Sequence, residues 1–316
     1  MRKYYKRIVV ILLLVMINIC EADFMKELKK KSKDSNWKIM LYFQYNLNYK
    51  KELHLLDGTL TDSKKELYLL DGTLTDSNIV YDDIYNLQTK HRIEFFLKIT
   101  DKDANRPTEW VRFCDQYGKV VKEFSLDPNY HHSKLLAVAP DESELIFRTT
   151  ICIIKFDTRT LKTERFDIGG LKIETIEYSN DKSYILVGGV GYSMCIYEQS
   201  TGKIIPLGTG YFPRWNAGYD GVIYTKNGNP FYRIKEGAFE KNIKTLEEKH
   251  VPFYPEAYSP DREYYLHYKF SFWSGWMSER INVYLSPSKA TDKKNAVYIG
   301  GPFPFPRPNG CVWMAE

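Results

Sequence analysis

The sequence predicts an all-β protein of the β-propeller class, built most simply from six four-stranded blades. Four turn-like segments carry the aspartates Asp141, Asp181, Asp220 and Asp261, which are spaced 40, 39 and 41 residues apart. An apolar, strand-like run follows each of these turns. A fixed period near 40 residues, in which a turn precedes strands, is typical of propeller blades. The 25 tyrosines also favour strands over helices.

A second recurring turn supports this division of the chain. Residues 114–119 (Cys-Asp-Gln-Tyr-Gly-Lys), 156–160 (Phe-Asp-Thr-Arg-Thr) and 197–203 (Tyr-Glu-Gln-Ser-Thr-Gly-Lys) lie at one phase of the repeat. At this phase we expect the third strand of a blade to turn into the fourth. The expected strands are 79–87, 92–100, 109–114 and 120–126 in the first blade; 135–139, 144–149, 152–156 and 163–167 in the second; 173–178, 184–188, 194–197 and 203–207 in the third; 211–215, 222–225, 231–234 and 241–246 in the fourth; and 253–258, 263–270, 281–285 and 296–299 in the fifth.

The two ends of the chain are expected to share the last blade. Residues 305–314 resemble residues 212–216 and the strand after them, so they begin a further blade. Residues 37–45 and one copy of a duplicated segment at residues 50–77 can complete it. Mixing both termini in one blade removes an open sheet edge that would invite aggregation. Residues 37–316 are therefore expected to form one propeller domain of six blades, with five or seven as alternatives.

The first 22 residues have the composition of an export signal. Four basic residues precede an apolar core at residues 8–19, and Cys-Glu-Ala at residues 20–22 places small side chains at both cleavage-determining positions. The apolar core is shorter than the roughly 20 residues that cross a bilayer. The sequence therefore predicts a signal peptide over residues 1–22 and an exported protein, periplasmic or secreted.

Cys20 raises the alternative of a lipoprotein, because it follows the apolar core directly. The preceding residue is Ile19, where lipoprotein signals need a small side chain, so lipidation is less favoured. Residues 23–36 hold five lysines and few apolar residues, which predicts a polar leader. Contact of these lysines with anionic lipid is the alternative role.

The formal charge of +5 belongs mostly to the signal segment. Removal of residues 1–22 leaves 41 Lys and Arg against 39 Asp and Glu, a net charge of +2. A chain this close to neutrality gives no electrostatic support for a nucleic-acid partner. Nothing in the sequence signals a homo-oligomer.

Residues 50–63 and 64–77 are tandem copies that differ only at His54 and Tyr68. Each copy contains Leu-Leu-Asp-Gly-Thr, which looks like the first motif of haloacid-dehalogenase-type phosphatases. The nucleophilic aspartate of that motif is replaced here by Leu55 and Leu69, which have no nucleophilic group. We interpret each Asp-Gly as a tight turn between strands.

The sequence predicts no catalytic residue, no metal ligand and no cofactor. None of the six histidines has metal-ligand spacing, and the adjacent His131 and His132 point in opposite directions on an extended chain. No Gly-x-Ser-x-Gly nucleophile motif is present. Asp141, Asp181 and Asp261 are expected to accept backbone hydrogen bonds in the blade turns.

The four cysteines after the signal segment are expected to be buried free thiols. Cys114, Cys152, Cys195 and Cys311 fall in different predicted blades. Packed sheets lie about 10 Å apart, whereas a disulfide needs Cα atoms within about 7 Å. A buried thiol packs as a small apolar group.

The turns carry a resemblance to a known family. Tyr-Ser-Asn-Asp at residues 178–181 and Tyr-Ser-Pro-Asp at residues 258–261 are each followed by a strand, and Thr-Gly-Lys at residues 201–203 marks a hairpin. This pattern resembles the WD-like repeats of TolB-type propellers over residues 78–316, although most copies lack the usual glycine after the aspartate. The resemblance implies an envelope or secreted binding domain, and in some members a propeller that guards a peptidase.

The position of each loop in the strand order of its blade predicts which loops share one face of the propeller. Loops between second and third strands, and between one blade and the next, open on the same face; they include residues 100–109, 126–134, 208–215 and 271–280. Exposed Trp, Tyr and Arg on loops held by a rigid scaffold are typical interface anchors. The candidate binding residues on this face are Trp273, Trp276, Arg280, Arg106 and Trp215. A lid formed by Trp273 and Trp276 over their own blade is the alternative.

The favoured function is a binding module for a protein or peptide partner in the cell envelope or extracellular space. The alternative is a propeller enzyme, a lyase or hydrolase that acts on a glycan or small ester in the central channel. An enzyme is less favoured because no catalytic motif is present. A secreted structural or surface-display domain is the third class.

Overall fold

A computed structural model of the protein describes fourteen stretches of the chain. They are residues 37–45, 48–55, 78–86, 88–98, 108–115, 119–127, 132–149, 151–189, 191–228, 234–259, 261–270, 280–288, 296–304 and 310–315. The chain forms two compact units, Tyr68–Tyr254 and the combination of Met1–Leu67 with Pro255–Glu316. The expectation of a single domain stays a prediction. None of the helices in the described stretches is long and apolar enough to span a membrane.

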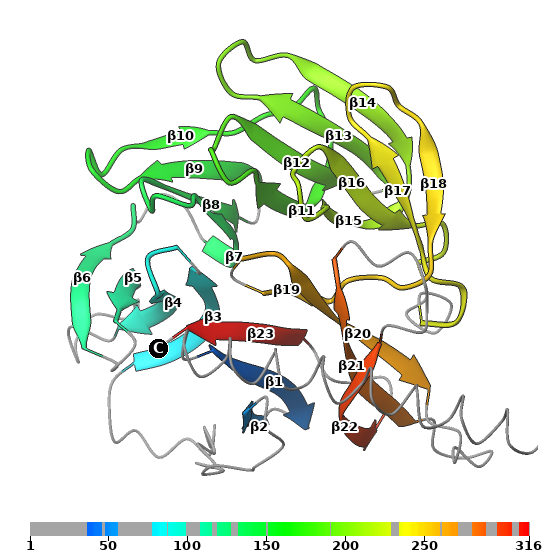
Figure 1. The fold of residues 1–316 in the computed structure, drawn as a ribbon. Coiled ribbons are helices and arrows are strands. Elements are labelled where there is room, and N and C mark those ends of the chain that lie inside the picture. The colour runs from blue at the N-terminus through cyan, green and yellow to red at the C-terminus, as the bar shows by residue number, and fades with distance from the viewer. Residues whose placement is uncertain are drawn as a thin grey trace, which may run out of the picture. The chain divides into compact units, whose positions relative to one another are not determined.

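The unit from Tyr68 to Tyr254 contains four antiparallel sheets of four strands, each built from consecutive strands (Figure 1). The first blade consists of β3 (Asn78–Asn86), β4 (His91–Lys98), β5 (Thr108–Cys114) and β6 (Val120–Ser125). The second consists of β7 (His132–Val138), β8 (Glu144–Thr149), β9 (Ile153–Asp157) and β10 (Thr163–Arg165). The third consists of β11 (Ile173–Tyr178), β12 (Tyr184–Gly189), β13 (Ser193–Glu198) and β14 (Ile204–Thr209). The fourth consists of β15 (Tyr211–Trp215), β16 (Gly221–Thr225), β17 (Ala238–Asn242) and β18 (Glu248–Val251).

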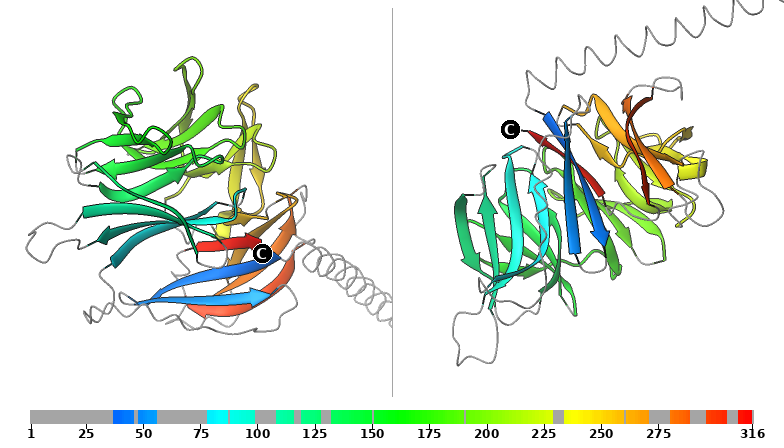
Figure 2. Two further views of the ribbon diagram at one scale, coloured as in Figure 1. Left: turned by 90° about the vertical axis from the view of Figure 1, so that its left-hand side faces the viewer. Right: turned by 90° about the horizontal axis from the view of Figure 1, so that it is seen from below.

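The other unit contains a fifth four-stranded blade and a sheet that joins both termini. The fifth blade consists of β19 (Ala257–Tyr258), β20 (Tyr264–Phe270), β21 (Arg280–Pro287) and β22 (Val297–Pro304). The terminal sheet has the order β2-β1-β23, from β2 (Asn48–Leu55), β1 (Trp37–Tyr45) and β23 (Gly310–Ala315). The C-terminal strand β23 lies antiparallel beside β1 (Figure 2).

The observed blade count differs from the one predicted. Five sheets are complete four-stranded blades, not six, and the terminal sheet has three strands among the described residues. Its two N-terminal strands include the first copy of the duplicated segment up to Leu55. The second copy lies outside the described residues. Five blades were among the predicted alternatives.

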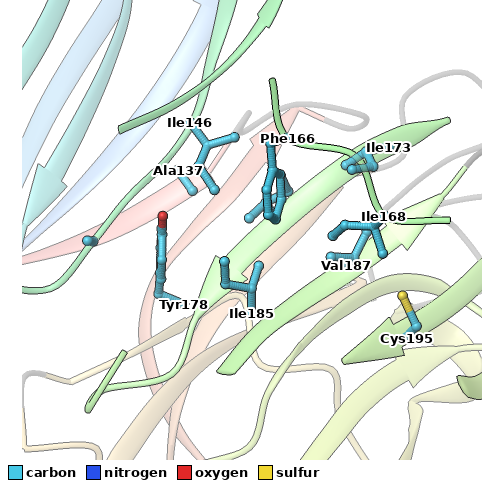
Figure 3. Close-up of a cluster of buried hydrophobic side chains, with 11 residues drawn as sticks. Ala137, Ile146, Phe166, Ile168, Ile173, Tyr178, Ile185, Val187 and Cys195 are labelled. Carbon is cyan, nitrogen blue, oxygen red and sulfur yellow. The ribbon is translucent and has the colours of Figure 1, made fainter. Parts of the chain in front are cut away.

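The blades of the larger unit are held together by apolar side chains between consecutive sheets. The middle strands are buried on both faces, so successive residues enter different apolar layers. In β8, Leu145 and Phe147 join the layer shared with the first blade, whereas Ile146 joins the layer shared with the third. Figure 3 shows the second of these layers. Strands buried on both faces therefore appear in the sequence as unbroken apolar runs.

Every predicted aspartate cap forms. The carboxylates of Asp141, Asp181 and Asp261 accept hydrogen bonds of 3.1, 3.1 and 3.0 Å from the backbone N–H two residues later. In the fourth blade, the Asn216 side chain replaces the aspartate and accepts hydrogen bonds from the N–H groups of Asp220 and Gly221. The periodic turns are therefore structural devices that fix the first hairpin of the second, third, fourth and fifth blades.

The prediction was wrong for the second half of the fourth blade. The third strand is β17, which starts at Ala238, and the fourth is β18, whereas residues 231–234 and 241–246 were expected to supply these two strands. Residues 231–233 lie outside the described part of the chain. Gly237 precedes β17 with φ of 80°, and a Cβ there would approach the Val251 carbonyl oxygen to 2.5 Å. Asn242 then begins the hairpin turn, because its side chain accepts hydrogen bonds from two following N–H groups.

The prediction of buried free thiols is confirmed for Cys114 and Cys195, whereas Cys152 is a free thiol that is only half-buried. Burial raises the pKa of both buried thiols. They therefore stay protonated and apolar at neutral pH.

Candidate functional site

The turns between second and third strands present exposed apolar side chains on a rigid frame. In the second blade this turn carries Ile151, which is 84% exposed. The Thr149 hydroxyl accepts hydrogen bonds from the N–H groups of Ile151 and Cys152 and donates one of 2.8 Å to the Cys152 carbonyl. These hydrogen bonds fix the backbone of the turn, from which the Ile151 side chain extends into water.

The equivalent turn of the third blade presents Tyr192, which is 49% exposed. Its backbone has φ of 70°, and its N–H donates a 3.0 Å hydrogen bond to the Gly189 carbonyl. Its own carbonyl accepts a 2.7 Å hydrogen bond from Gly210, in the crossing to the fourth blade. The Tyr192 ring lies 3.9 Å from the Tyr211 ring, tilted by 37°. The two tyrosines form a paired aromatic surface where the third blade passes into the fourth.

Beside this tyrosine pair lies a cavity of about 540 Å³, within the range of small-ligand pockets. One wall comes from the third blade and the crossing after it, and the other comes from the fourth blade. We call this the blade 3–4 cavity. Its lining residues are Tyr192, Leu207, Gly208, Thr209, Gly210, Tyr211, Tyr224, Lys226, Lys241 and Glu248.

Three charged groups in the cavity come from the fourth blade: Lys226 directly after β16, Lys241 in β17 and Glu248 in β18. The Lys226 ammonium lies 2.6 Å from one oxygen of Glu248, and the Tyr224 hydroxyl donates to the other. These two hydrogen bonds, led by that of Lys226, lower the pKa of Glu248. The Lys241 ammonium donates a 2.8 Å hydrogen bond to the Leu207 carbonyl on the opposite wall.

Polar groups at the opposite end of the strands link neighbouring blades. The Glu142 carboxylate in the β7–β8 turn lies 2.9 Å from the His91 ring nitrogen and 3.4 Å from the Lys122 ammonium, both in the first blade. Lys182, in the β11–β12 turn, pairs with Glu144 at 3.0 Å. These contacts tie the turns of consecutive blades and have a structural role.

No group of three or more His, Cys, Asp or Glu in the described stretches is placed to hold a metal ion. The Glu248 carboxylate in the cavity is already paired with an amine and a phenol. The cavity offers a charged and aromatic binding surface with donors on both walls.

Known structures match this chain by fold. TolB from Acinetobacter baumannii superposes with a TM-score of 0.53 at 13% identity, covering 90% of this chain and 68% of TolB. The chain has a β-propeller fold that resembles TolB. The β-propeller domain of the Trilobed protease from Pyrococcus furiosus matches with a TM-score of 0.47 at 16% identity, covering 71% of this chain and 72% of that domain.

A third structure, the acylaminoacyl peptidase of Pyrococcus horikoshii, has a TM-score of 0.44 at 15% identity and covers 67% of this chain and 39% of the peptidase. No protein-family model matches the sequence, and no curated protein matches it. At these identities the likeness to TolB establishes the fold.

One of the predicted binding residues belongs to the core of this TolB-like propeller. Trp215 is 0% exposed and packs between the third and fourth blades. Its indole N–H donates a 3.1 Å hydrogen bond to the Glu177 carbonyl. Trp215 is therefore an anchor between blades, which corrects the expectation that it is exposed on the binding face.

The other predicted binding residues are not tested by the structure. Arg106, Trp273 and Trp276 lie outside the described residues, and only the backbone of Arg280, in β21, is described. They stay predictions.

The structure identifies functional candidates that the sequence analysis missed. Tyr211 lies in the predicted segment 208–215, but Tyr192, Lys226, Lys241 and Glu248 were not singled out. Tyr192 and Lys226 follow the second strands of their blades. The prediction that loops between second and third strands share one face could therefore have identified them. Lys241 and Glu248 could not be found, because the fourth-blade hairpin was misplaced.

Proposed function

We propose that the protein is an exported binding module for a protein or peptide partner in the cell envelope or extracellular space. The observation that carries the proposal is the pair of rigid, exposed apolar side chains, Ile151 and Tyr192, at corresponding turns of neighbouring blades. The blade 3–4 cavity, at the Tyr192 end of the third blade, adds charged groups to this face. Aromatic and apolar anchors with charged groups beside them are characteristic of protein interfaces.

The TolB-like fold supports this proposal through what the resemblance implies, an envelope or secreted binding domain. Residues 1–22 support export, and the proposal places cleavage after Ala22. Mass spectrometry of the N-terminus of the exported protein tests this step. A mature chain that starts at Asp23 is expected, and a retained N-terminus or a lipid on Cys20 would contradict it.

Site-specific photo-crosslinking tests the binding face in the full chain. A photoreactive phenylalanine analogue is placed at Ile151 or Tyr192, and at Leu161 or Leu246 as controls. Leu161 and Leu246 are 56% and 48% exposed, but they lie in third-to-fourth-strand turns, at the other end of the strands. The test is performed in cells of the native host, and Trp273→Ala/Trp276→Ala is added as a second variant.

A discrete adduct from the Ile151 and Tyr192 positions, absent from the two controls, is expected. Loss of this adduct in the Trp273→Ala/Trp276→Ala variant would extend the interface to those residues. Equal adducts at all four positions, or none at any, would contradict a partner on this face. The enzyme alternative would then be tested with glycan and ester substrates.

A further inference from the structure

The blade 3–4 cavity holds one cation more than it holds anions. Both oxygens of Glu248 already accept a hydrogen bond, one from Lys226 and one from Tyr224. Glu248 also attracts the Lys241 ammonium electrostatically but forms no ion pair with it, so one carboxylate serves two ammonium groups and the cavity keeps one excess positive charge. A buried or half-buried charge favours a counter-ion, because a low local dielectric strengthens the attraction.

Lys241 also has hydrogen-bonding capacity to spare. An ammonium group carries three N–H donors, and the Leu207 carbonyl accepts one of them. Among the described residues, no carboxylate oxygen lies within the 4.0 Å limit of an ion pair with Lys241. The lysine is half-buried in β17, and its bond to Leu207 fixes the ammonium between the two walls. A ligand oxygen that enters the cavity can therefore meet a pre-positioned donor.

The tyrosine pair gives the cavity an apolar side. The Tyr192 and Tyr211 rings lie against each other in a tilted arrangement, and both line the cavity. Gly228 makes this position possible, because a Cβ at residue 228 would lie 2.2 Å from Cε1 of Tyr211. A planar or apolar group can lie on the tyrosine rings while a neighbouring acidic group reaches Lys241.

We propose that the blade 3–4 cavity binds a carboxylate side chain, Asp or Glu, of an extended peptide segment, with an adjacent aromatic side chain on the Tyr192–Tyr211 pair. This inference rests on the proposed function and names the chemistry that the partner supplies. A carboxylate accepts a charge-assisted hydrogen bond from Lys241, which is stronger than one between neutral groups.

The charge of the cavity favours a carboxylate over a phosphate. A phosphate group carries a charge of about −1.5 to −2 at neutral pH, which exceeds the single excess positive charge of the cavity. The Glu248 carboxylate, on the same wall as Lys241, would repel the part of the phosphate charge that Lys241 does not balance. A carboxylate brings one negative charge and leaves the cavity neutral.

Two matched, fluorescein-labelled pentapeptides test the proposal with the full chain. The probes are Gly-Tyr-Glu-Tyr-Gly and Gly-Tyr-Gln-Tyr-Gly with a blocked C-terminus, and fluorescence anisotropy measures their dissociation constants. The protein variants are Lys241→Gln and the control Lys244→Gln, which removes an exposed lysine from the turn of the same hairpin. Thr209→Glu is a second variant, because it places a carboxylate at the cavity and leaves Lys241 intact.

The wild-type chain is expected to bind the Glu peptide about tenfold more tightly than the Gln peptide. Lys241→Gln and Thr209→Glu should each abolish this preference, whereas Lys244→Gln should keep it. If Lys241→Gln does not fold, the preference of the Thr209→Glu variant for the Glu peptide over the Gln peptide tests the proposal by itself.

Equal affinity for the two peptides, an unchanged preference in Thr209→Glu, or no binding of either peptide at about millimolar concentration would overturn the inference. Failure here is separable from failure of the proposed function. The photo-crosslinks from Ile151 and Tyr192, repeated in the Thr209→Glu variant, report partner binding without reference to the carboxylate. Persistent crosslinks together with equal peptide affinities would support the proposed binding module and contradict the proposed carboxylate site.

Discussion

Trp215 in β15 contacts Glu177 in β11 through two hydrogen bonds. The indole N–H of Trp215 donates to the Glu177 backbone carbonyl at 3.1 Å, and the backbone N–H of Trp215 donates to the Glu177 carboxylate at 3.1 Å. These are the first strands of the third and fourth blades. One residue pair therefore joins the two blades both through the backbone and through side chains.

Trp215→Phe should lower the free energy of unfolding by about 2–3 kcal/mol, because it leaves the Glu177 carbonyl without this donor and creates a cavity. Chemical denaturation measures the change. Trp110→Phe is the control, since the indole of half-buried Trp110 donates to Thr108 within its own strand. An equal loss of unfolding free energy in both variants would show that the hydrogen bond between the blades stabilises the protein no more than the one within a strand.

Three corresponding hairpins differ in the residue that adopts a left-handed conformation. The residue is Leu161 in the second blade (φ 57°), Gly202 in the third (φ 71°) and Leu246 in the fourth (φ 60°). In each hairpin its N–H donates to the carbonyl of the residue four positions earlier. A leucine in this conformation is strained by roughly 1–2 kcal/mol, and both leucines are exposed.

Leu161→Gly and Leu246→Gly should therefore each raise the free energy of unfolding by about 0.5–1 kcal/mol, after the extra backbone entropy of glycine is subtracted. Gly202→Ala should lower it by a similar amount, since a Cβ at residue 202 has room and only the backbone is strained. Urea unfolding of the three variants measures the changes. Destabilisation by both leucine replacements would contradict the interpretation.

His267 gives stability a dependence on pH in the unit that contains the fifth blade. The side chain is 0% exposed, and burial, with a contribution from Lys269, lowers its pKa to about 3. An unfolded histidine has a pKa near 6.5. At a pH between these two pKa values, the unfolded state therefore binds a proton that the folded state does not. The contribution of neutral His267 to the free energy of unfolding is complete above about pH 6.5 and is lost as the pH falls toward about 3.

The free energy of unfolding should fall by about 1.4 kcal/mol per pH unit between pH 6 and pH 5 because of this residue. Urea titrations at pH 6.0, 5.5 and 5.0 measure the slope. His267→Gln should flatten it, although that variant also changes the contact with the Ser286 hydroxyl at 3.1 Å. His250→Gln removes an exposed imidazole and is the control. A slope that persists in His267→Gln would assign the pH dependence to other groups.

Removal of the Glu248 carboxylate should increase affinity for the Glu pentapeptide. Glu248→Gln takes the negative charge out of the blade 3–4 cavity and releases Lys226 from its ion pair. The Glu peptide should bind about threefold more tightly, in line with the modest strength of exposed ion pairs. Fluorescence anisotropy at two salt concentrations measures this, and the gain should shrink in high salt. Weaker binding of the Glu peptide would contradict the proposed arrangement of charges.

Gly228→Ala should weaken both pentapeptides, because its Cβ would displace the Tyr211 ring from its pairing with Tyr192. We expect a loss of about tenfold, typical of an aromatic contact at an interface. Gly218→Ala is the control, since a Cβ there meets only the flexible Asp220 side chain at 3.1 Å. Unchanged affinity in Gly228→Ala would exclude the tyrosine pair from binding.

Local hydrogen bonding made much of the fold predictable from the sequence. The turns at Asp141, Asp181 and Asp261 form as expected because each carboxylate accepts a hydrogen bond from an N–H only two residues away. The fourth-blade hairpin was misplaced: it begins at Asn242, whose side chain accepts hydrogen bonds from two following N–H groups, within the segment expected to be the fourth strand. The candidate binding face was predicted only in part, since Tyr211 lay in a named segment and Lys241 did not.

The sequence by itself determined the β-propeller class and the positions of most strands, because a turn and its flanking strands depend on residues close together in the chain. The tertiary structure decided which aromatic residues are buried and which are exposed. Trp215 and Tyr192 are both aromatic residues in or beside β-strands, yet one is 0% and the other 49% exposed. Their exposure depends on the neighbouring blade, where Trp215 contacts Glu177, 38 positions away, and Tyr192 contacts Tyr211, 19 positions away. The blade 3–4 cavity likewise exists only where two sheets meet, because its charged residues come from the fourth blade, whereas Tyr192 comes from the β12–β13 turn of the third blade.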